Sequence, residues 1–246
     1  MPQPDACQGG KEVDKLKPVF LLAGGRAAVR ASPDPLIQAV FRECGVASPV
    51  VAYVGTAHGD DRRFFGFMSN FLFEAGAAEV NHALMCPEGA DLGKAKETLS
   101  SADLVYVGGG DVDEGIRVLE ERNMVGYLQR LYEDGKPFFG VSAGAIMLAK
   151  KWVRWRNPDD DSTAELFQCL GIAPVICDTH AEQDNWEELK MALKLADEGE
   201  KGYGIVSGTA IKVNPTGEVQ AIGGAAQQFI RRKGEAVRLP DIQPSM

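Results

Sequence analysis

The strongest constraint on the fold is an alternation that runs through the first 150 residues. Short apolar, β-rich runs occur at residues 18–25, 49–55, 78–85, 102–110 and 136–142. Amphipathic stretches separate them and predict helices over residues 35–43, 62–75, 112–132 and 143–151. We expect the apolar runs to be strands, because strands that alternate with helices are typical of a parallel sheet with crossover helices. In the second helix, "RRFFGFMSNFLFEA", the aromatic residues are expected to form an inward-facing stripe.

The pattern changes after residue 152. The segment "WVRWRNPDDDSTAEL" (152–166) predicts a polar connection broken by proline, and residues 173–180 predict another strand. A helix is expected over 187–195, and residues 203–224 indicate β-hairpins with a turn at "NPTGE". The fold class is therefore α/β, with a three-layer arrangement of a mostly parallel sheet flanked by helices, followed by C-terminal β-hairpins.

The chain of 246 residues is long enough to bury a full core without disulfides or metals. Residues 1–17 are polar and are expected to be a disordered tail. No repeat or linker divides the remainder, so residues 18–246 are expected to form a single domain.

Charge and cysteine content limit the partners and the compartment. The net charge of −9 argues against nucleic-acid and anionic-membrane partners, which need a basic surface. The chain has neither a basic start followed by an apolar h-region nor an apolar run of membrane-spanning length. We therefore expect a cytoplasmic protein. Its five cysteines lack CxxC pairs, which fits a reducing compartment and gives no zinc-ribbon spacing; they are Cys7, Cys44, Cys86, Cys169 and Cys177.

Glycines gather at the ends of four predicted strands. The turns at residues 24–26, 55–58, 108–111 and 140–142 all contain glycine, and the last ends in Ser142. Any one of them is explained by the needs of a tight turn. In open α/β sheets, however, ligands bind outside the carboxyl ends of the strands. Four such turns at one edge favour a functional site there.

Ser142 lies in "GVSAG", which fits the G-x-S-x-G pattern of a nucleophile on a strand–turn–helix elbow. The flanking glycines allow a strained serine, and the N–H of Ala143 would face an oxyanion. The structural alternative is that Ser142 only caps a helix. Gly109 and Gly110, at the end of the preceding strand, would supply further N–H donors. A phosphate loop is the rival for "GGG", but the spacings of the known phosphate-binding motifs are absent.

Three histidines are candidates for the general base that a serine nucleophile requires. His82 lies in the middle of a predicted strand and is expected to be packed. His58 and His180 both follow strands at the functional edge, and either could act there by position alone.

The motifs "YVGGGD", "GVSAGA" and "DTH" together resemble the S51 peptidase family, which includes the aspartyl dipeptidases (peptidase E) and the cyanophycinases. The resemblance runs from about residue 18 to 225. It implies a fold like that of the class I glutamine amidotransferases, with serine in place of the nucleophilic cysteine.

The resemblance implies roles by position. Ser142 would be the nucleophile and His180, rather than His58, its base, while Ala143 and Gly110 or Gly109 would form the oxyanion hole. Asp178 in "DTH" would orient the substrate or the imidazole, unless it is only a turn residue. We also expect Asp111 and His58 to contact the substrate.

The third member of the triad is expected between the serine and the histidine. The candidates there are Asp159, Asp160, Asp161 and Glu165, with Asp178 as a further one. We choose Asp160, although a run of three aspartates is more often a solvated loop.

The chain departs from the cyanophycinases after "DTH". It reads "HAEQDNWEEL", without the His-Phe and arginines that follow in that group, so cyanophycin is not the expected substrate. Glu182, Asp184 and Trp186 are expected near the substrate, where an acidic rim would favour the free amino end of a peptide. Other arginines could replace the missing ones: Arg26, Arg62, Arg63, Arg154 and Arg156.

The sequence predicts a serine-dependent peptidase or amidohydrolase that cleaves a small peptide through an acyl-enzyme, with no metal or organic cofactor. For the assembly state, the sequence is compatible with a homodimer. One alternative is a non-catalytic member of the fold that binds a small ligand. Another is an esterase-type serine hydrolase, but there the histidine comes late, whereas 66 residues follow His180 here. An amidotransferase would need cysteine at position 142.

Overall fold

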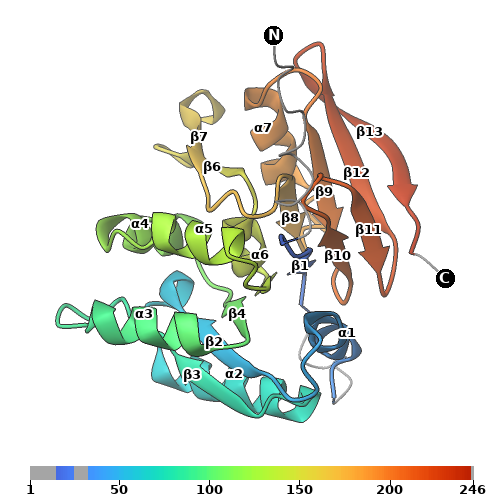
Figure 1. Ribbon diagram of the computed structural model, residues 1–246. Helices are drawn as coiled ribbons and strands as arrows, with labels where there is room; N and C mark the ends of the chain where they lie inside the picture. Colours follow the sequence, from blue (N-terminus) through green and yellow to red (C-terminus); the bar gives the residue numbers. More distant parts are fainter. Residues whose placement is uncertain (1–14, 25–32, 245–246) are drawn as a thin grey trace, which may run out of the picture.

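The structure, a computed structural model, describes residues 15–24 and 33–244 (Figure 1). Its centre is a seven-stranded sheet with the order β11-β10-β1-β5-β4-β2-β3. The five strands from β1 to β3 in this order are parallel, whereas β10 runs antiparallel to β1 and β11. The bounds are Val19–Leu22 (β1), Val50–Val54 (β2), Glu79–His82 (β3), Leu104–Val107 (β4), Phe138–Val141 (β5), Ala210–Val213 (β10) and Val219–Ile222 (β11).

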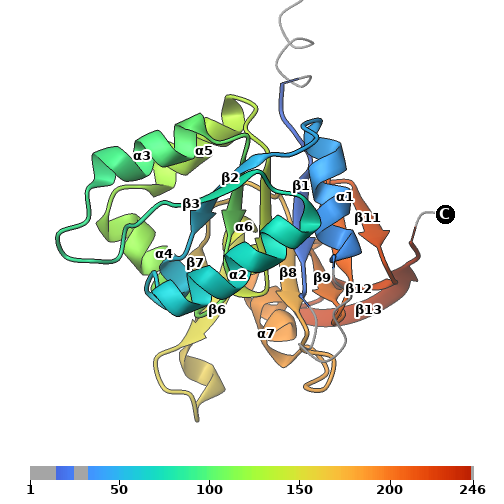
Figure 2. The same cartoon turned by 90° about the horizontal axis from the view of Figure 1, so that it is seen from below.

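Helices cover both faces of this sheet. One face carries α1 (Pro35–Cys44) and α2 (Arg62–Ala75), which lie in front of the strands in Figure 2. The other carries α3 (Leu92–Ser101), α4 (Val112–Glu121), α5 (Val125–Glu133) and α6 (Ala143–Leu148). Each face has its own hydrophobic cluster. The predicted three-layer α/β fold is therefore confirmed.

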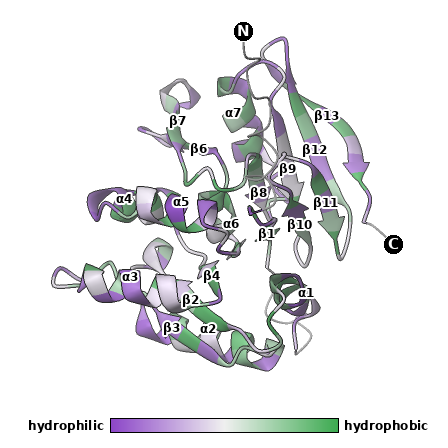
Figure 3. Cartoon of the chain, in the orientation of Figure 1, coloured by the Kyte–Doolittle hydropathy of each residue, from purple (hydrophilic) through white to green (hydrophobic). Residues whose placement is uncertain are grey.

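Strand β2 shows why the sheet needs two covers. Val51 and Tyr53 point into the cluster under α1 and α2, whereas Ala52 and Val54 point into the opposite cluster. Successive side chains of a strand alternate between the faces, so an all-apolar strand is stable only when both faces are buried. The helices supply the matching apolar sides; along α2, for example, hydrophilic and hydrophobic residues both occur in Figure 3, whereas α6 is apolar and buried throughout.

Apart from β10 and β11, which join the central sheet, the chain after α6 forms a hairpin and a second sheet. β6 (Lys151–Trp155) and β7 (Ala164–Gln168) form a hairpin, with the short helix η2 (Asp161–Thr163) in its loop. A four-stranded sheet has the order β13-β12-β9-β8, and α7 (Glu187–Leu195) packs against it. Its strands are β8 (Ile176–Thr179), β9 (Lys201–Ile205), β12 (Ala226–Arg232) and β13 (Glu235–Ile242). Within the predicted range 203–224, β10 and β11 form a hairpin, whereas β9 belongs to the other sheet; a further hairpin, β12–β13, follows that range.

Two helices have the predicted bounds, and the ends of α2 carry clear local signals. The Asp61 carboxylate accepts a hydrogen bond from the Phe64 N–H at the start of α2, and Gly76 ends the helix with φ = 115°. Helix α7 also begins and ends where predicted.

Three local predictions were wrong. Helix α3 was not expected, and the helix after Ser142 ends at Leu148 rather than Lys151. The segment 152–166 is a hairpin rather than an irregular connection. Arg154 and Glu165 lie opposite each other in it and form an ion pair, while the proline and the aspartates occupy the turn. Cross-strand pairs of this kind stabilise strands that are individually too polar to be recognised.

The predicted inward-facing aromatic stripe of α2 is only partly present. The helix buries Met68, Leu72 and Ala75, which follow one another at helical spacing. Phe65 and Phe71 are partly buried and pack against the same cluster, whereas Phe67 and Phe73 are 49% and 47% exposed. The inward side of α2 is therefore a mainly aliphatic seam with an aromatic ring on either side.

The ends of the described chain bear on two further expectations. The tail predicted over residues 1–17 lies outside the described residues up to residue 14, while Lys15 forms an ion pair with Asp134 at 2.8 Å. Gly25 and Arg26 also lie outside the described residues. Among the helices that are described, none combines the length and the apolar character needed to cross a membrane. The four described cysteines are free thiols.

Candidate active site

Ser142 lies on a sharp turn between β5 and α6. Its backbone has φ = 56° and ψ = −129°, a conformation that is sterically costly for any residue with a Cβ. The turn is held from below, because the Ser142 N–H donates a hydrogen bond of 2.9 Å to the Leu22 carbonyl at the end of β1. The side chain is thereby projected at the carboxyl edge of the central sheet.

The two glycines of the G-x-S-x-G pattern allow α6 to pack directly on the sheet. A Cβ on Gly144 would lie 2.0 Å from the Val107 carbonyl oxygen of β4. A Cβ on Gly140 would lie 2.4 Å from the Gly144 carbonyl oxygen. In both cases the new Cβ would meet backbone atoms, which cannot move aside as the end of a side chain can. Only glycine therefore fits at these two positions.

His180 reaches Ser142 from the second sheet. It follows β8, and its N–H donates a hydrogen bond of 2.9 Å to the Ile205 carbonyl of β9. Strand β8 packs against α6, so its carboxyl end lies beside the serine turn. The Nε2 atom of His180 is 2.7 Å from the Oγ of Ser142. This is the hydrogen-bond distance that a nucleophile and its general base require.

The other two histidines are engaged elsewhere. The Nε2 of His58 lies 2.7 Å from the Tyr53 hydroxyl, and its Nδ1 accepts the Asp61 N–H at 3.1 Å. Burial lowers the pKa of the His58 imidazole. The Nε2 of His82 lies 3.1 Å from an Asp60 carboxylate oxygen. The structure thus brings His180, and neither His58 nor His82, to Ser142.

The glycine-rich end of β4 runs alongside Ser142. A Cβ on Gly109 would lie 3.1 Å from the Ser142 Cβ, and Gly110 has φ = 145°, which side chains rarely allow. Within the described residues, the backbone N–H groups of Gly109, Gly110 and Ala143 have no hydrogen-bond acceptor. Unpaired N–H groups beside a serine Oγ are what an oxyanion would require.

Asp111 supports this loop rather than lining the pocket. Its carboxylate accepts the Glu114 N–H at 2.9 Å and so caps α4, and its own N–H donates to the Ala57 carbonyl at 2.7 Å. Ala57 belongs to the short helix η1 (Thr56–His58). The predicted substrate residues Asp111 and His58 therefore both lie in the framework that holds Gly110.

Sequence analysis missed the anchor of η1, which is the buried carboxylate of Asp60. One oxygen accepts the N–H groups of Met85 and Cys86 at 2.6 and 2.7 Å, and the other faces His82. Burial would raise the Asp60 pKa, but these hydrogen bonds outweigh it and lower the pKa. No local motif marks this residue, because its partners lie more than 20 positions away.

A pocket of about 360 Å³ opens beside the serine and the histidine. Its wall contains four carboxylate side chains, of Asp178, Asp184, Glu187 and Glu188, and no lysine or arginine from residues 15–24 or 33–244. The remaining lining residues are Gly110, Val112, Ser142, Ala143, Ile146, Trp152, Thr179, His180 and Ala181.

Asp178 is the most deeply buried of these carboxylates, with 4% of its surface exposed. Its Oδ1 accepts the N–H of Thr179 at 2.7 Å, whereas Oδ2 has no hydrogen-bond partner among the described residues. Burial, followed by the nearby charges of Glu188 and Asp184, raises the pKa of Asp178 to about 7, although the backbone N–H groups of Thr179 and Leu189 oppose the rise. The predicted substrate residue Asp178 therefore does line the pocket, where no described lysine or arginine pairs with it.

The geometry does not support Asp160 as the acid of a triad. Asp160 is exposed and caps η2, where it accepts hydrogen bonds of 2.9 and 2.7 Å from the N–H and hydroxyl of Ser162. Asp161 accepts the Trp155 indole N–H, and Glu165 pairs with Arg154 and Arg156. Among the described residues no carboxylate is hydrogen-bonded to His180. The hairpin turn uses its carboxylates to stabilise itself.

Glu182 is a carboxylate on which His180 acts electrostatically. Burial would raise its pKa, but hydrogen bonds from Ser207 and the positive charge that His180 can carry lower it. It does not line the pocket, and Trp186, also expected near the substrate, is 1% exposed and packs against Gly204. Of the three residues expected near the substrate, Glu182, Asp184 and Trp186, only Asp184 lines the pocket.

Sequence analysis also missed Trp152 and Glu188. The pair "EE" at 187–188 opens a predicted helix and is explained by its preference for the first turn. Only the packing of α7 against β8 brings Glu188 to Asp178. In the described part of the chain, no three or more histidine, cysteine, aspartate or glutamate side chains are arranged so that they could hold a metal ion.

Two solved peptidase structures resemble this chain in fold. A crystal structure of a peptidase from an acI-B1 Actinobacterium has a TM-score of 0.69 and 18% identity, with 93% of this chain and 97% of that one covered. The 1.5 Å structure of a putative peptidase E protein from Listeria monocytogenes EGD-e has a TM-score of 0.60 and 18% identity, with 84% and 98% covered. These two likenesses concern the fold.

The sequence comparison decides the family. A search of curated proteins yields no match. The profile of Peptidase family S51, however, matches residues 19–220, which include the serine turn, the glycine-rich loop and His180. The chain therefore belongs to peptidase family S51.

Proposed function

We propose that this peptidase is a serine hydrolase that cleaves a peptide or amide bond in a small peptide through an acyl-enzyme on Ser142. The observation that carries the proposal is the 2.7 Å separation of the Ser142 Oγ and the His180 Nε2. A positive φ at the serine and unpaired N–H groups around it give further support.

In the proposed mechanism, the Oγ of Ser142 attacks the carbonyl carbon while His180 accepts the serine proton. The oxyanion receives hydrogen bonds from the N–H of Ala143 and of Gly110 or Gly109. Collapse of the intermediate breaks the C–N bond, and His180 returns the proton to the leaving amine. Water, deprotonated by His180, then attacks the ester and releases the acyl product and the free serine.

Glu182 is the carboxylate that we assign to the stabilisation of the protonated His180, in place of Asp160. Its charge interacts with the imidazole, and its own hydrogen bonds from Ser207 hold it ionised. Asp178 is proposed to contact the substrate, since it lines the pocket. Asp111 and His58 are proposed to act through the position of Gly110.

A fluorophosphonate probe tests the proposal directly, because it phosphonylates only an activated serine. The wild-type protein should be labelled, whereas Ser142→Ala should not be labelled and His180→Ala should react at least about 100-fold more slowly. Equal labelling of the wild type and Ser142→Ala would contradict the mechanism. A wild type that binds peptides but is neither labelled nor hydrolyses them would identify the non-catalytic alternative.

The substrate is proposed to be a small peptide. A dipeptide library that includes Asp-X pairs, screened with the wild type and Ser142→Ala, would define it. Cytoplasmic location and a homodimer stay predictions from the sequence.

A further inference from the structure

The pocket beside Ser142 has an unusual charge for a site that receives a peptide. Four carboxylates line it, and among the described residues of its wall His180 is the only basic side chain. A cluster of acidic residues on a surface is usually solvated and does not by itself indicate a ligand site. Here one member, Asp178, is buried and its Oδ2 lacks a hydrogen-bond partner among the described residues. A buried carboxyl group without a partner is costly to ionise, and a cation that arrives with a ligand would offset this cost.

Glu188 connects this buried charge to the surface. It lines the same pocket, and it and Asp178 interact as like charges. Burial, followed by the charges of Asp184 and Asp111, raises the pKa of Glu188, although a hydrogen bond from Trp152 opposes the rise. A positive charge placed here would be attracted by several carboxylates at once.

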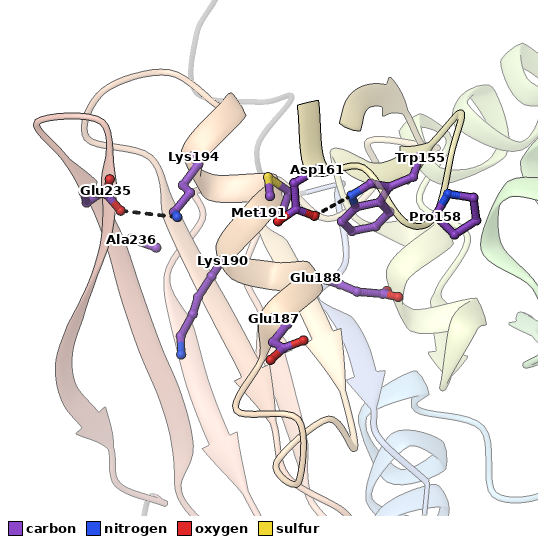
Figure 4. Close-up of a pocket in the computed structure, with 10 residues that line it drawn as sticks. All are labelled: Trp155, Pro158, Asp161, Glu187, Glu188, Lys190, Met191, Lys194, Glu235 and Ala236. Carbon is purple, nitrogen blue, oxygen red and sulfur yellow. Dashed lines mark hydrogen bonds and ion pairs between the residues drawn. The ribbon is translucent and has the colours of Figure 1, made fainter. Parts of the chain in front are cut away.

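The cations nearest in sequence and space are committed to other partners. Glu188 also lines a larger neighbouring pocket of about 780 Å³, which contains Lys190 and Lys194. Figure 4 shows both lysine side chains directed away from Glu188. Lys194 pairs with Glu235 at 3.5 Å, and the ammonium of Lys190 lies 5.7 Å from the centre of the Phe229 ring.

The arginines of the β6–β7 hairpin are likewise occupied. Arg154 pairs with Asp113 and Glu165, and Arg156 pairs with Glu165. Neither lines the pocket beside Ser142. No described basic side chain other than His180 is therefore available there for an anionic substrate group, while the negative charge is left for a cationic one.

We propose that the pocket beside Ser142 binds a primary ammonium group of the substrate against Glu188, with the buried carboxylate of Asp178 as the second negative charge. The inference rests on the proposed function, since it names the substrate class of the same site. The ammonium can be the free α-amine of a peptide or the side chain of a lysine.

Binding to the full-length Ser142→Ala variant tests the inference without requiring catalysis. The probes are norleucyl-leucine, lysyl-leucine and their N-acetylated forms, measured by isothermal titration calorimetry at pH 8. Acetyl-norleucyl-leucine carries no ammonium group. It should bind at least about tenfold more weakly than each peptide whose ammonium group reaches the pocket. An α-amine site favours norleucyl-leucine over its acetylated form, whereas a side-chain site favours acetyl-lysyl-leucine over acetyl-norleucyl-leucine. Equal affinity for all four peptides would overturn the proposal.

Charge removal identifies the residues responsible. In the Ser142→Ala background, Glu188→Gln and Asp178→Asn should each reduce the preference for the ammonium to within about threefold. Glu97→Gln, the same change on the exposed surface of α3, should leave the preference intact. Glu188 is exposed, so its variant remains informative if Asp178→Asn fails to fold. A preference that persists in Glu188→Gln would also overturn the assignment.

The two proposals can fail separately. Fluorophosphonate labelling of the wild type combined with no ammonium preference would leave the serine hydrolase standing and remove the cation site. An ammonium preference in Ser142→Ala combined with no labelling of the wild type would support the cation site and remove the acyl-enzyme mechanism.

Discussion

The Ser142 Oγ and the His180 Nε2 lie 2.7 Å apart although the two residues belong to turns after strands of different sheets. Both residues have positive φ, 56° for Ser142 and 48° for His180. A residue with a Cβ is strained in this region, and such strain persists only where the surrounding structure imposes it. The pair is therefore built at a cost in stability, which the following substitutions can measure.

Replacing Ser142 by glycine should remove activity and increase stability relative to replacement by alanine. Both variants lack the nucleophile, but only glycine adopts φ = 56° and ψ = −129° without a Cβ clash. We expect Ser142→Gly to be more stable than Ser142→Ala by about 1 kcal/mol. Glycine relieves the backbone strain of the folded state, and the greater entropy that it gives the unfolded chain offsets part of this gain. Urea unfolding of both variants measures the difference. An alanine variant as stable as the glycine variant would show that the turn is not strained.

Alanine at Gly110 should displace the glycine-rich loop. Its Cβ would lie 2.0 Å from the Ala57 carbonyl oxygen, and φ = 145° excludes side chains in any case. We expect at least about a 100-fold slower reaction with the fluorophosphonate, because an oxyanion donor is lost. Gly89→Ala, at a position with no atom within 4 Å of the new Cβ, is the matched control. An unchanged labelling rate in Gly110→Ala would exclude this loop from the oxyanion hole.

The buried Asp178 predicts a stability that falls as the pH rises. Its pKa is about 7 in the folded protein against 3.8 for an ordinary aspartate, so the folded state holds a proton that the unfolded state has lost. Below about pH 4 the group is protonated in both states and does not affect the free energy of unfolding. Between about pH 4 and pH 7 the free energy of unfolding falls as the pH rises, by a few kcal/mol in total. Asp178→Asn cannot ionise and should flatten this slope in urea unfolding from pH 5 to 8. A wild-type slope that is unchanged in the variant would contradict the assignment.

Asp60 predicts the opposite dependence. Its pKa is lowered in the folded protein, so its stabilising contribution is present above the pKa of the unfolded chain and is lost as the pH falls through the folded value. In Asp60→Asn the side-chain amide can direct its NH₂ group towards backbone N–H groups that need an acceptor. The substitution should therefore lower the free energy of unfolding by about 2–4 kcal/mol at pH 7.

Thermal unfolding of Asp60→Asn beside Asp159→Asn measures this loss. Asp159 is exposed on the hairpin turn, and its variant is expected to stay within about 0.5 kcal/mol of the wild type. The difference between the wild type and Asp60→Asn should shrink towards pH 3. A variant as stable as the wild type at pH 7 would show that Asp60 does not anchor η1.

Helix α2 offers a stabilising substitution. Gly66 lies inside the helix, and an alanine Cβ there would meet no atom within 4 Å. We expect Gly66→Ala to raise the unfolding free energy by about 0.5–1 kcal/mol, because alanine has the higher helix propensity and restricts the unfolded chain. Chemical denaturation would reveal the gain, and a loss of stability would show that the exposed side of α2 is packed in solution.

Much of the fold could be predicted from local patterns. The strands of the central sheet are short apolar runs, and α2 has a capping aspartate and a terminal glycine. The hairpin β6–β7 was missed because its stability comes from pairs across the strands, such as Arg154 with Glu165, which no short window contains.

The site divides in the same way. The sequence by itself determined the serine turn and its glycines, because backbone sterics at Gly140, Ser142 and Gly144 act within a few residues of one another. It also determined that two histidines end strands at one edge. Only the tertiary structure decided that His180 meets Ser142, that Asp160 stays in its own turn, and that Glu188 faces Asp178. Those outcomes depend on how α6, α7 and the second sheet pack, and packing joins residues whose separation along the chain leaves no local pattern.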